Sequence, residues 1–255
     1  MISKIKIHFI RSLHQKKGRE ENGQFLAEGS KIVMDLMDSR FPLREIYALP
    51  EWLNSHGNLL QNRQALIAEV NENEMGKITA LSSPSPVLAV FDLTSSGKVP
   101  SFPINDIVLA LDGIRDPGNM GTIIRIADWF GIRQVICSED TVELFNPKVV
   151  QATMGSIARV NVAYTSLFGW LSALTPGIPV YGTFLEGNDI YQEELASSGV
   201  IIMGNESRGI SPEMDSLVNH RIFIPSFSTG NHAESLNASI ATAIVCSEFR
   251  RRKKI

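Results

Sequence analysis

The stretch Ile107-Val-Leu-Ala-Leu-Asp-Gly-Ile-Arg-Asp-Pro-Gly-Asn-Met-Gly-Thr-Ile-Ile-Arg125 joins a short apolar run to a helical pattern through a turn. The run Ile107–Leu111 has the length of a buried strand, and the residues near 120–130 have helical spacing. Pro117 and Gly118 favour a turn, and Asn119 is a natural helix N-cap. The stretch therefore predicts a strand, a turn and a helix, which is the repeating unit of a parallel sheet.

The same alternation of short apolar runs and helical patterns continues along the chain. Four further strands are predicted, at Gln134–Cys137, Ile178–Phe184, Val200–Gly204 and Arg221–Ile224. Helical patterns fall between and after them, near residues 147–157, 212–218 and 235–250. We therefore expect an α/β fold with a mostly parallel sheet, in which ligands bind beyond the carboxyl ends of the strands.

A smaller α/β unit is predicted ahead of this sheet, over residues 1–91. Short strands at Phe25–Gly29 and Glu45–Leu49 flank a helix at Ser30–Met37. Residues 92–105 are rich in Ser, Gly and Pro and lack periodicity, so they are predicted to be a linker. The second domain is then expected to run over residues 106–255.

The composition is that of an ordinary globular protein. The 255 residues are 44% hydrophobic and 20% charged, which argues against a disordered chain. Cys137 and Cys246 cannot alone make a disulfide framework or a zinc site, so we expect no metal and a reducing cytoplasm. No apolar run reaches the roughly 18 residues of a membrane helix, and no membrane is expected as a partner.

The charge is uneven although the net value is only −3. Six basic residues precede the first acidic one, Glu20: they are Lys4, Lys6, Arg11, Lys16, Lys17 and Arg19. A second basic run occupies residues 250–254, whereas residues 111–249 hold 7 basic against 15 acidic side chains. Each basic run fits a surface that binds phosphates, or else a solvated tail and cations at a helix C-terminus.

The first loop after a predicted strand places Gly121 and Arg125 four residues apart, on one helical face. A glycine lets a ligand approach the backbone closely, and an arginine one turn later points back towards that opening. The alternative is ordinary capping with a surface arginine.

In the second loop, Gly204, Asn205, Glu206 and Gly209 form a turn, and Ser211-Pro212 begins a helix. Its spacing is close to a phosphate loop, but the Lys-Ser/Thr of that motif is absent, so ATP binding is not predicted. Glu206 could accept hydrogen bonds from a ligand or hold an arginine, or it could be a solvated turn carboxylate.

The third loop follows Pro225 and leads into a helix rich in small residues. Ser235 and Asn237 either cap that helix or serve a site. His232 suggests a Ser/His hydrolase, but the chain has no G-x-S-x-G elbow. A nucleotide-dependent oxidoreductase would need a G-x-G-x-x-G after its first strand, which is also missing.

Taken together, these three loops resemble, in order, the motifs of the SpoU-type (TrmH-like) branch of the SPOUT RNA methyltransferases. The matching segments are Asp116–Ala127, Met203–Ile210, and Ile224-Pro225 with Glu234–Ala241. Asn146–Gly155 resembles an intervening family segment, and Arg11–Gly29 more weakly resembles the family's L30e-like N-terminal domain, which binds RNA substrates. The loop between Pro225 and Ser235 is a few residues longer than the usual pattern.

The resemblance implies a parallel sheet with a C-terminal trefoil knot, bound S-adenosyl-L-methionine, and a homodimer formed through the catalytic domain. It also implies methyl transfer to a ribose 2′-hydroxyl of tRNA or rRNA. The implied catalytic residues are Arg125, Asn119, Glu206, Ser235 and Asn237. The implied cofactor-binding residues are Thr183, Gly204, Ile224, Ser235 and Leu236. The expected RNA-binding residues are Arg11, Lys16, Lys17, Arg19 and Arg125.

Given that reaction, we expect Arg125 to bind the RNA phosphate and stabilise the developing alkoxide. Whether it also removes the hydroxyl proton is left open, because arginine almost never deprotonates in proteins. Glu206 is expected to orient Arg125 or the acceptor ribose. The alternative function, from another class, is a non-catalytic RNA-binding protein on the same fold.

Overall fold

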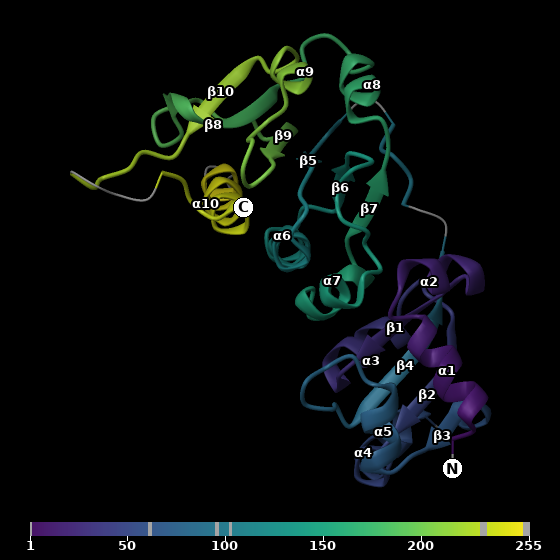
Figure 1. Ribbon diagram of the computed structural model, residues 1–255. Helices are drawn as coiled ribbons and strands as arrows, with labels where there is room; N and C mark the ends of the chain where they lie inside the picture. The colour runs from purple at the N-terminus through teal and green to yellow at the C-terminus, as the bar shows by residue number, and fades with distance from the viewer. Residues whose placement is uncertain (1, 61–62, 95–96, 102–103, 230–233, 252–255) are drawn as a thin grey trace. The chain divides into compact units, whose positions relative to one another are not determined.

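The computed structural model describes residues 2–60, 63–94, 97–101, 104–229 and 234–251 (Figure 1). The chain divides into two compact units. The N-terminal unit comprises residues 1–95 together with 143–158, and the C-terminal unit comprises residues 96–142 together with 159–255. Among the described helices, none has the length and apolar character that a membrane crossing requires.

The N-terminal unit is built on a four-stranded sheet in the order β1-β4-β2-β3. Its strands are β1 (Gln24–Glu28), β2 (Leu43–Ala48), β3 (Ile67–Glu69) and β4 (Val87–Asp92). β4 is antiparallel to β1 and β2, and β3 is parallel to β2. The helices that accompany them in residues 2–94 of the described chain are α1 (Lys4–Ser12), α2 (Lys16–Asn22), α3 (Ser30–Met37), α4 (Pro50–His56) and α5 (Glu72–Ile78).

One hydrophobic core joins α1, α5 and this sheet. Ile10 and Leu13 pack with Met75 and Ile78, and all four are buried together with Leu88 of β4. α5 begins with a capping box, in which Asn71 accepts from the backbone N–H of Glu74 at 2.9 Å and Glu74 accepts from that of Asn71 at 3.1 Å. These bonds satisfy orphan donors of the first helical turn and fix where α5 starts.

The segment Glu143–Ala158 groups with the N-terminal unit although it comes from the middle of the chain. It contains α7 (Pro147–Ala152) and a 3₁₀ turn at Ser156–Ala158. The Phe145 ring lies 4.7 Å from that of Phe25 and 5.8 Å from that of Phe41, centroid to centroid. Aromatic burial and ring contacts of this kind hold the segment in place, an association that the sequence did not predict.

The C-terminal unit contains a six-stranded sheet in the order β10-β8-β9-β5-β6-β7, parallel throughout. Its strands are β5 (Ile107–Asp112), β6 (Gln134–Cys137), β7 (Asn161–Tyr164), β8 (Val180–Asp189), β9 (Gly199–Gly204) and β10 (His220–Phe223). The predicted α/β class with a parallel sheet is therefore confirmed. The trefoil knot stays a prediction.

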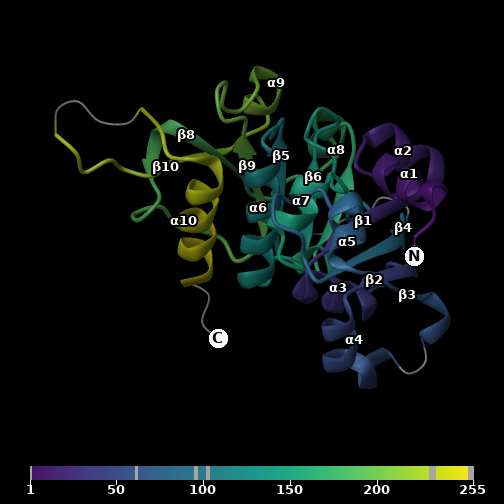
Figure 2. The same cartoon turned by 60° about the horizontal axis from the view of Figure 1, so that its bottom comes forward.

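The helices of this unit are α6 (Pro117–Trp129), α8 (Leu167–Ser172), α9 (Pro212–Asp215) and α10 (Ala238–Arg251). α6 and α10 lie side by side in both views (Figures 1 and 2). The guanidinium of Arg250 donates to the carbonyls of Phe130 (2.8 Å) and Gly131 (3.3 Å) and pairs with Asp106 at 2.8 Å. The first residue of the basic C-terminal run therefore has a structural role at the end of α6, while residues 252–254 lie outside the described part.

Both cysteines are free thiols and both are buried. Burial raises the pKa of the Cys246 thiol to about 12 and raises that of Cys137 as well. A thiol is reactive as its thiolate, so neither group is poised for chemistry in the folded chain.

Candidate active site

Two of the motif loops leave the C-terminal sheet from neighbouring strand ends. β5 and β9 are paired along their whole length, so that Asp112 lies opposite Gly204. The chain turns directly after each of these residues. In addition, the backbone N–H of Ser211 donates to the Asp112 carboxylate at 2.7 Å, which ties the far end of the second loop back to the end of β5. The loops after β5 and β9 therefore meet at the carboxyl edge of the sheet, where ligands of such folds bind.

α6 starts earlier than it would if Asn119 were its N-cap. Its N-cap is Asp116, whose side chain accepts from the backbone N–H of Asn119 at 2.7 Å, and Pro117 is the first helical residue. The prediction that Asn119 caps this helix is therefore wrong. Proline fits the first helical position because its fixed φ suits a helix and its missing N–H would have had no partner there.

The amide of Asn119, freed from capping, lies at the centre of a polar network. Its Nδ2 donates to Oε1 of Glu206 at 3.0 Å, and its Oδ1 accepts from Nδ2 of Asn237 at 2.9 Å. Asn119 is only 8% exposed, whereas Glu206 and Asn237 are exposed, so the amide is the buried member of the network. One buried amide thus brings together three residues that belong to three different sequence motifs.

Asn237 has two roles in this network. Its Oδ1 accepts from the backbone N–H of Ser239 at 2.9 Å and from the Ser239 hydroxyl at 2.6 Å, which caps the start of α10. Its Nδ2 meanwhile reaches Asn119. Capping and a place in the site are therefore not alternatives for Asn237, since the two ends of one amide serve both. Ser235, two residues earlier, is exposed.

Glu206 and Arg125 are not in contact. The Glu206 carboxylate accepts from Asn119, from Asn205 Nδ2 at 3.3 Å, and from the backbone N–H of Asp116 at 3.4 Å. Arg125 is exposed on α6 and has no hydrogen bond or ion pair with any residue that the structure describes. Of the two roles expected for Glu206, the structure shows no contact with Arg125, and the orientation of the acceptor ribose stays a prediction: Glu206 fixes the loops, and the guanidinium is free to meet a ligand.

Thr183, one of the residues expected to hold a cofactor, begins an irregular part of β8. In the pairing with β10, Gly182 lies opposite Arg221 but Asn188 lies opposite Ile222, so Thr183–Gly187 bulge out of the ladder. The pairing of β8 with β9 also ends at Gly182. This bulge places main-chain donors and acceptors outside the regular sheet, which suits recognition of an adenine edge and a ribose.

Gly204 shows how closely the main chain is packed beside that bulge. A Cβ added at Gly204 would lie 2.3 Å from the carbonyl carbon of Gly209 and from the amide nitrogen of Ile210. Thr183, at the start of the bulge, donates its hydroxyl to the carbonyl of Ile202 at 3.1 Å. Ile224 follows β10, and Leu236 is half exposed ahead of α10. The donor set, mostly backbone groups among small and apolar side chains, fits S-adenosyl-L-methionine.

The basic residues of α1 and α2 separate into two kinds. Lys16 and Lys17 are exposed, and each lies 3.7 Å from a glutamate one turn later. Arg11 lines a hollow of about 340 Å³ on α1, together with Lys4 and His8. These side chains are available to a polyanion.

Arg19 is different, and the prediction that it binds RNA is wrong. Its side chain is 2% exposed, and it makes two parallel hydrogen bonds to Glu143, of 3.0 and 2.6 Å. A third N–H group donates to the carbonyl of Leu13 at 2.9 Å. A buried bidentate pair of this kind is structural, because separating it would leave a charge without a partner.

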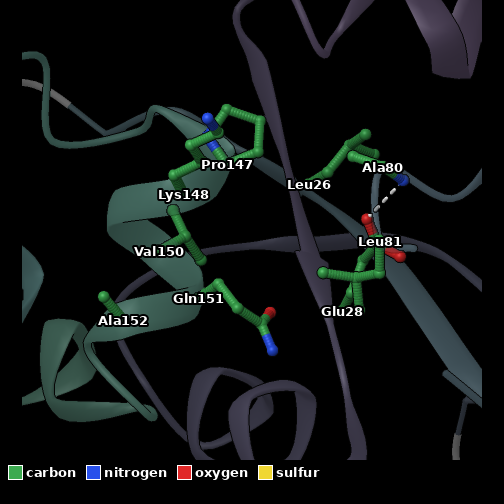
Figure 3. A pocket seen from close by; sticks show the side chains of 9 residues that line it. All are labelled: Leu26, Glu28, Ala80, Leu81, Pro147, Lys148, Val150, Gln151 and Ala152. Atoms are coloured by element: carbon green, nitrogen blue, oxygen red, sulfur yellow. Dashed lines mark hydrogen bonds between the residues drawn. The ribbon is translucent and has the colours of Figure 1, made fainter. Parts of the chain in front are cut away.

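A largely apolar pocket of about 260 Å³ lies in the N-terminal unit, between β1 and α7 (Figure 3). Glu28 lies at one side of it, but its carboxylate already accepts from the Thr79 hydroxyl and from the backbone N–H of Ala80 at 2.9 Å. Gln151 and Lys148 come from α7 on the other side. The carboxylate that lines this pocket is therefore already engaged within the N-terminal unit. His232, the residue that suggested a hydrolase, lies outside the described residues.

Comparison with known proteins identifies the family. The sequence model of the SpoU rRNA methylase family matches residues 106–247, and that of the MRM3-like substrate binding domain matches residues 4–89. The chain belongs to the SpoU rRNA methylase family. Membership confirms the resemblance drawn from the three motifs.

Three relatives resemble the chain over nearly its whole length. The 23S rRNA (guanosine(2553)-2′-O)-methyltransferase RlmP of Bacillus subtilis is 29% identical and covers 96% of each chain. A solved structure from Porphyromonas gingivalis, described as TrmH-family, is 37% identical, with a TM-score of 0.84 over 99% of this chain and 100% of that one. An AdoMet-bound rRNA methyltransferase from Sinorhizobium meliloti is 32% identical, with a TM-score of 0.83 over 98% and 97% of the two chains.

Proposed function

We propose that this protein is an S-adenosyl-L-methionine-dependent methyltransferase that modifies a ribose 2′-hydroxyl of ribosomal RNA. The observation that carries the proposal is the Asn119–Glu206–Asn237 network, which joins the three family motifs at the carboxyl edge of the sheet. The named activity of the Bacillus subtilis relative and the cofactor bound by the Sinorhizobium meliloti relative support it.

The cofactor, when bound, supplies a methyl group made electrophilic by a sulfonium. The protein must then align the acceptor and handle the charge that develops on it. The backbone around Thr183, Gly204 and Leu236, with Ile224 and Ser235, would hold the cofactor. The polar network would fix the loops on which these residues lie.

Arg125 is proposed to act on the RNA. Its guanidinium is exposed and has no partner among the described residues, so it can bind a phosphate and stabilise the developing alkoxide at low cost in rearrangement. Glu206, already holding the Asn119 amide, would position the acceptor with Ser235 and Asn237. The group that finally takes the hydroxyl proton is not assigned to any of these residues.

RNA binding is proposed to extend to the N-terminal unit through Arg11, Lys16 and Lys17. These side chains lie on α1 and α2, within the part of the chain that matches the substrate binding domain. Arg19 is left out of this surface because it is buried against Glu143. Contacts to phosphates from such residues give affinity without sequence preference. Action on ribosomal RNA would place the protein in the cytoplasm.

A homodimer formed through the catalytic domain is also proposed. Trp129 at the end of α6 is 85% exposed, and Ile240 on the adjacent α10 is half exposed. Exposed large apolar side chains on two neighbouring helices suit a contact surface, and a second copy is the partner implied by the family resemblance. Light scattering should give twice the chain mass for the native protein, and the chain mass for Trp129→Glu.

The test of function is to incubate the protein with S-adenosyl-L-methionine labelled on its methyl group, with ribosomal RNA and with tRNA in separate reactions. We expect labelled 2′-O-methyl nucleosides from the ribosomal RNA. Binding of RNA without any label would instead support the non-catalytic alternative. Label appearing only in tRNA would keep the activity and change the substrate.

Arg125→Ala should reduce methyl transfer by at least about a hundredfold, because it removes a charge that acts on the transition state. Cofactor affinity, measured by calorimetry, should stay within about twofold, since Arg125 is not among the cofactor residues. Near-normal turnover by this variant would remove Arg125 from the mechanism.

A further inference from the structure

A second polar cluster lies beside the network, around the carboxylate of Asp140 in the loop after β6. Nη2 of Arg115 lies 3.2 Å from Oδ2 of Asp140, and Nη2 of Arg208 lies 3.9 Å from the same oxygen. Arg115 belongs to the loop after β5, and Arg208 belongs to the loop after β9. One carboxylate thus gathers two arginines from both loops that carry the network.

The position of Asp140 is itself fixed, through the peptide groups of Gly113. The Ser138 hydroxyl donates to Oδ1 of Asp140 at 2.7 Å and accepts from the backbone N–H of Gly113 at 2.9 Å. The carbonyl of Gly113 accepts from Nδ2 of Asn205 at 2.6 Å. Three loops are therefore tied together at one glycine, and the same Asn205 side chain contacts Glu206 at 3.3 Å.

Gly113 is needed for this arrangement. Its φ is +71°, in the left-handed region that favours glycine, and a Cβ there would lie 3.2 Å from Oδ2 of Asp140. The close approach of the Gly113 backbone and the Asp140 carboxylate therefore depends on glycine at this position.

The charges in this cluster do not cancel. Two guanidinium groups meet one carboxylate, and all three side chains are at least half exposed. Hydrogen bonds from Ser138 and Arg115 hold the pKa of Asp140 below its ordinary value, so it is ionised at neutral pH. Exposed ion pairs contribute little to stability, so stability alone gives little reason for this convergence.

The surplus charge also stands out against the region around it. Residues 111–249 hold 7 basic and 15 acidic side chains, and three of the seven are Arg115, Arg125 and Arg208. All three lie in the first two motif segments or directly before them. Three of the seven basic side chains of this largely acidic part of the chain therefore lie where the motif loops are, beside the carboxylates of Asp116 and Glu206.

We propose that Asp140 is a positioning residue that holds Arg115 and Arg208 side by side as a clamp for one phosphate of the RNA backbone next to the modified ribose. The two Nη2 atoms are at most about 7 Å apart, because each lies within 4 Å of one oxygen. Two oxygens of a single phosphate, each accepting a charge-assisted hydrogen bond of about 2.8 Å, can bridge that separation. The inference rests on the proposed function only for the identity of the polyanion.

The decisive variant is Asp140→Asn, because the loss of a negative charge and the loss of a positioning residue have opposite effects on the binding of RNA. Removing a negative charge should tighten the binding of a polyanion if net charge alone mattered. If Asp140 positions the arginines, the KM for ribosomal RNA should instead rise about fivefold, with kcat within about twofold and cofactor affinity unchanged. A KM that falls or stays the same would overturn the proposal.

The double variant Arg115→Ala/Arg208→Ala tests whether Asp140 acts through the two arginines. We expect its KM for ribosomal RNA to rise at least tenfold and the slope of log affinity against log salt to flatten by about 0.7 to 0.9, the value of one phosphate. Adding Asp140→Asn to this background should then change KM by less than about twofold. A further rise would show that Asp140 acts by another route, and would overturn the clamp.

Asp38→Asn is the matched control, since it removes the same charge from an exposed ion pair with Arg63, at 3.6 Å, in the N-terminal unit. It should leave the KM within about twofold of the native value. If the native protein transfers no methyl group, the proposed function fails and the clamp is tested by filter binding of ribosomal RNA alone. Asp140→Asn should weaken that binding about fivefold, and unchanged binding would overturn the clamp.

Discussion

At the scale of single residues, Asn119 shows what an amide can do that a carboxylate cannot. It donates to Glu206 with one atom and accepts from Asn237 with the other. The Asn119 amide is buried, so the loss of either bond leaves a buried polar atom without a partner. The joint position of the three motif loops therefore depends on the two-sided chemistry of one side chain.

Asn119→Asp should destabilise the fold by about 1 to 3 kcal/mol, because a carboxylate would replace the donor that faces Glu206. It should also reduce methyl transfer, since the loops that carry the site would separate. Chemical denaturation measures the first effect, and the labelled-methyl assay measures the second. Asn58→Asp, at an exposed position outside the site, is the control. If both variants behave alike, the network does not hold the loops.

The site residues were predictable from the sequence to different degrees. The motif order identified Asn119, Glu206 and Asn237, and the structure brings these three together. The partner of Glu206 was not predictable, because Asn119 and Arg125 lie six residues apart on one motif and the sequence does not reveal which of these donors reaches the carboxylate. Arg19 was misjudged because its ion pair is with Glu143, a residue 124 positions away.

At the scale of elements, local signals placed most of the C-terminal sheet and missed the elements held by tertiary contacts. β6 and α3 were predicted with their observed bounds, since short apolar runs and helical spacing mark them directly. β4 was missed because its apolar run directly precedes the linker. β7 was missed because its apolar run is only Val162-Ala163, between Asn161 and Tyr164. The start of α6 was misplaced because Asp116 and Pro117 together outcompete Asn119 as a cap.

α7 is held by residues that are distant in the sequence. Phe145, just ahead of it, completes an aromatic cluster with Phe25 and Phe41. Phe145→Ala should therefore lower the free energy of unfolding by about 2 to 3 kcal/mol, less than for a fully buried phenylalanine because Phe145 is partly exposed.

Phe168→Ala is the control for this substitution, since Phe168 is 42% exposed on α8. It should cost less than about 1 kcal/mol. Thermal unfolding of both variants, followed by circular dichroism, makes the comparison. Equal losses would mean that the aromatic cluster does not hold the 143–158 segment.

At the scale of the whole molecule, the division into units is not a division of the chain into two consecutive pieces. Residues 143–158 interrupt the C-terminal unit and complete the N-terminal one. A fragment of residues 96–255 would thus retain α7 and Phe145 without the surface that covers them. We expect this fragment to aggregate or to lose cooperative unfolding, because exposed apolar patches drive association.

Size-exclusion chromatography and calorimetry test that expectation. The comparison is the same fragment with residues 143–158 replaced by a short Gly/Ser linker, which removes the uncovered surface. The replaced fragment should be monodisperse or form a defined dimer. If residues 96–255 behave equally well with the segment left in, then the N-terminal unit is not needed to cover α7.

The interrupted arrangement also limits how the gene can be recombined. Consider a chimera that takes its first 95 residues from one relative and the remainder from another. It would pair the residue at position 19 of one parent with the residue at position 143 of the other. It would also combine the aromatic residues at positions 25 and 41 of one parent with that at position 145 of the other. Exchange of substrate specificity between relatives, in nature or in the laboratory, therefore has to transfer two separate stretches of coding sequence at once, and single-crossover libraries should be poor in folded members.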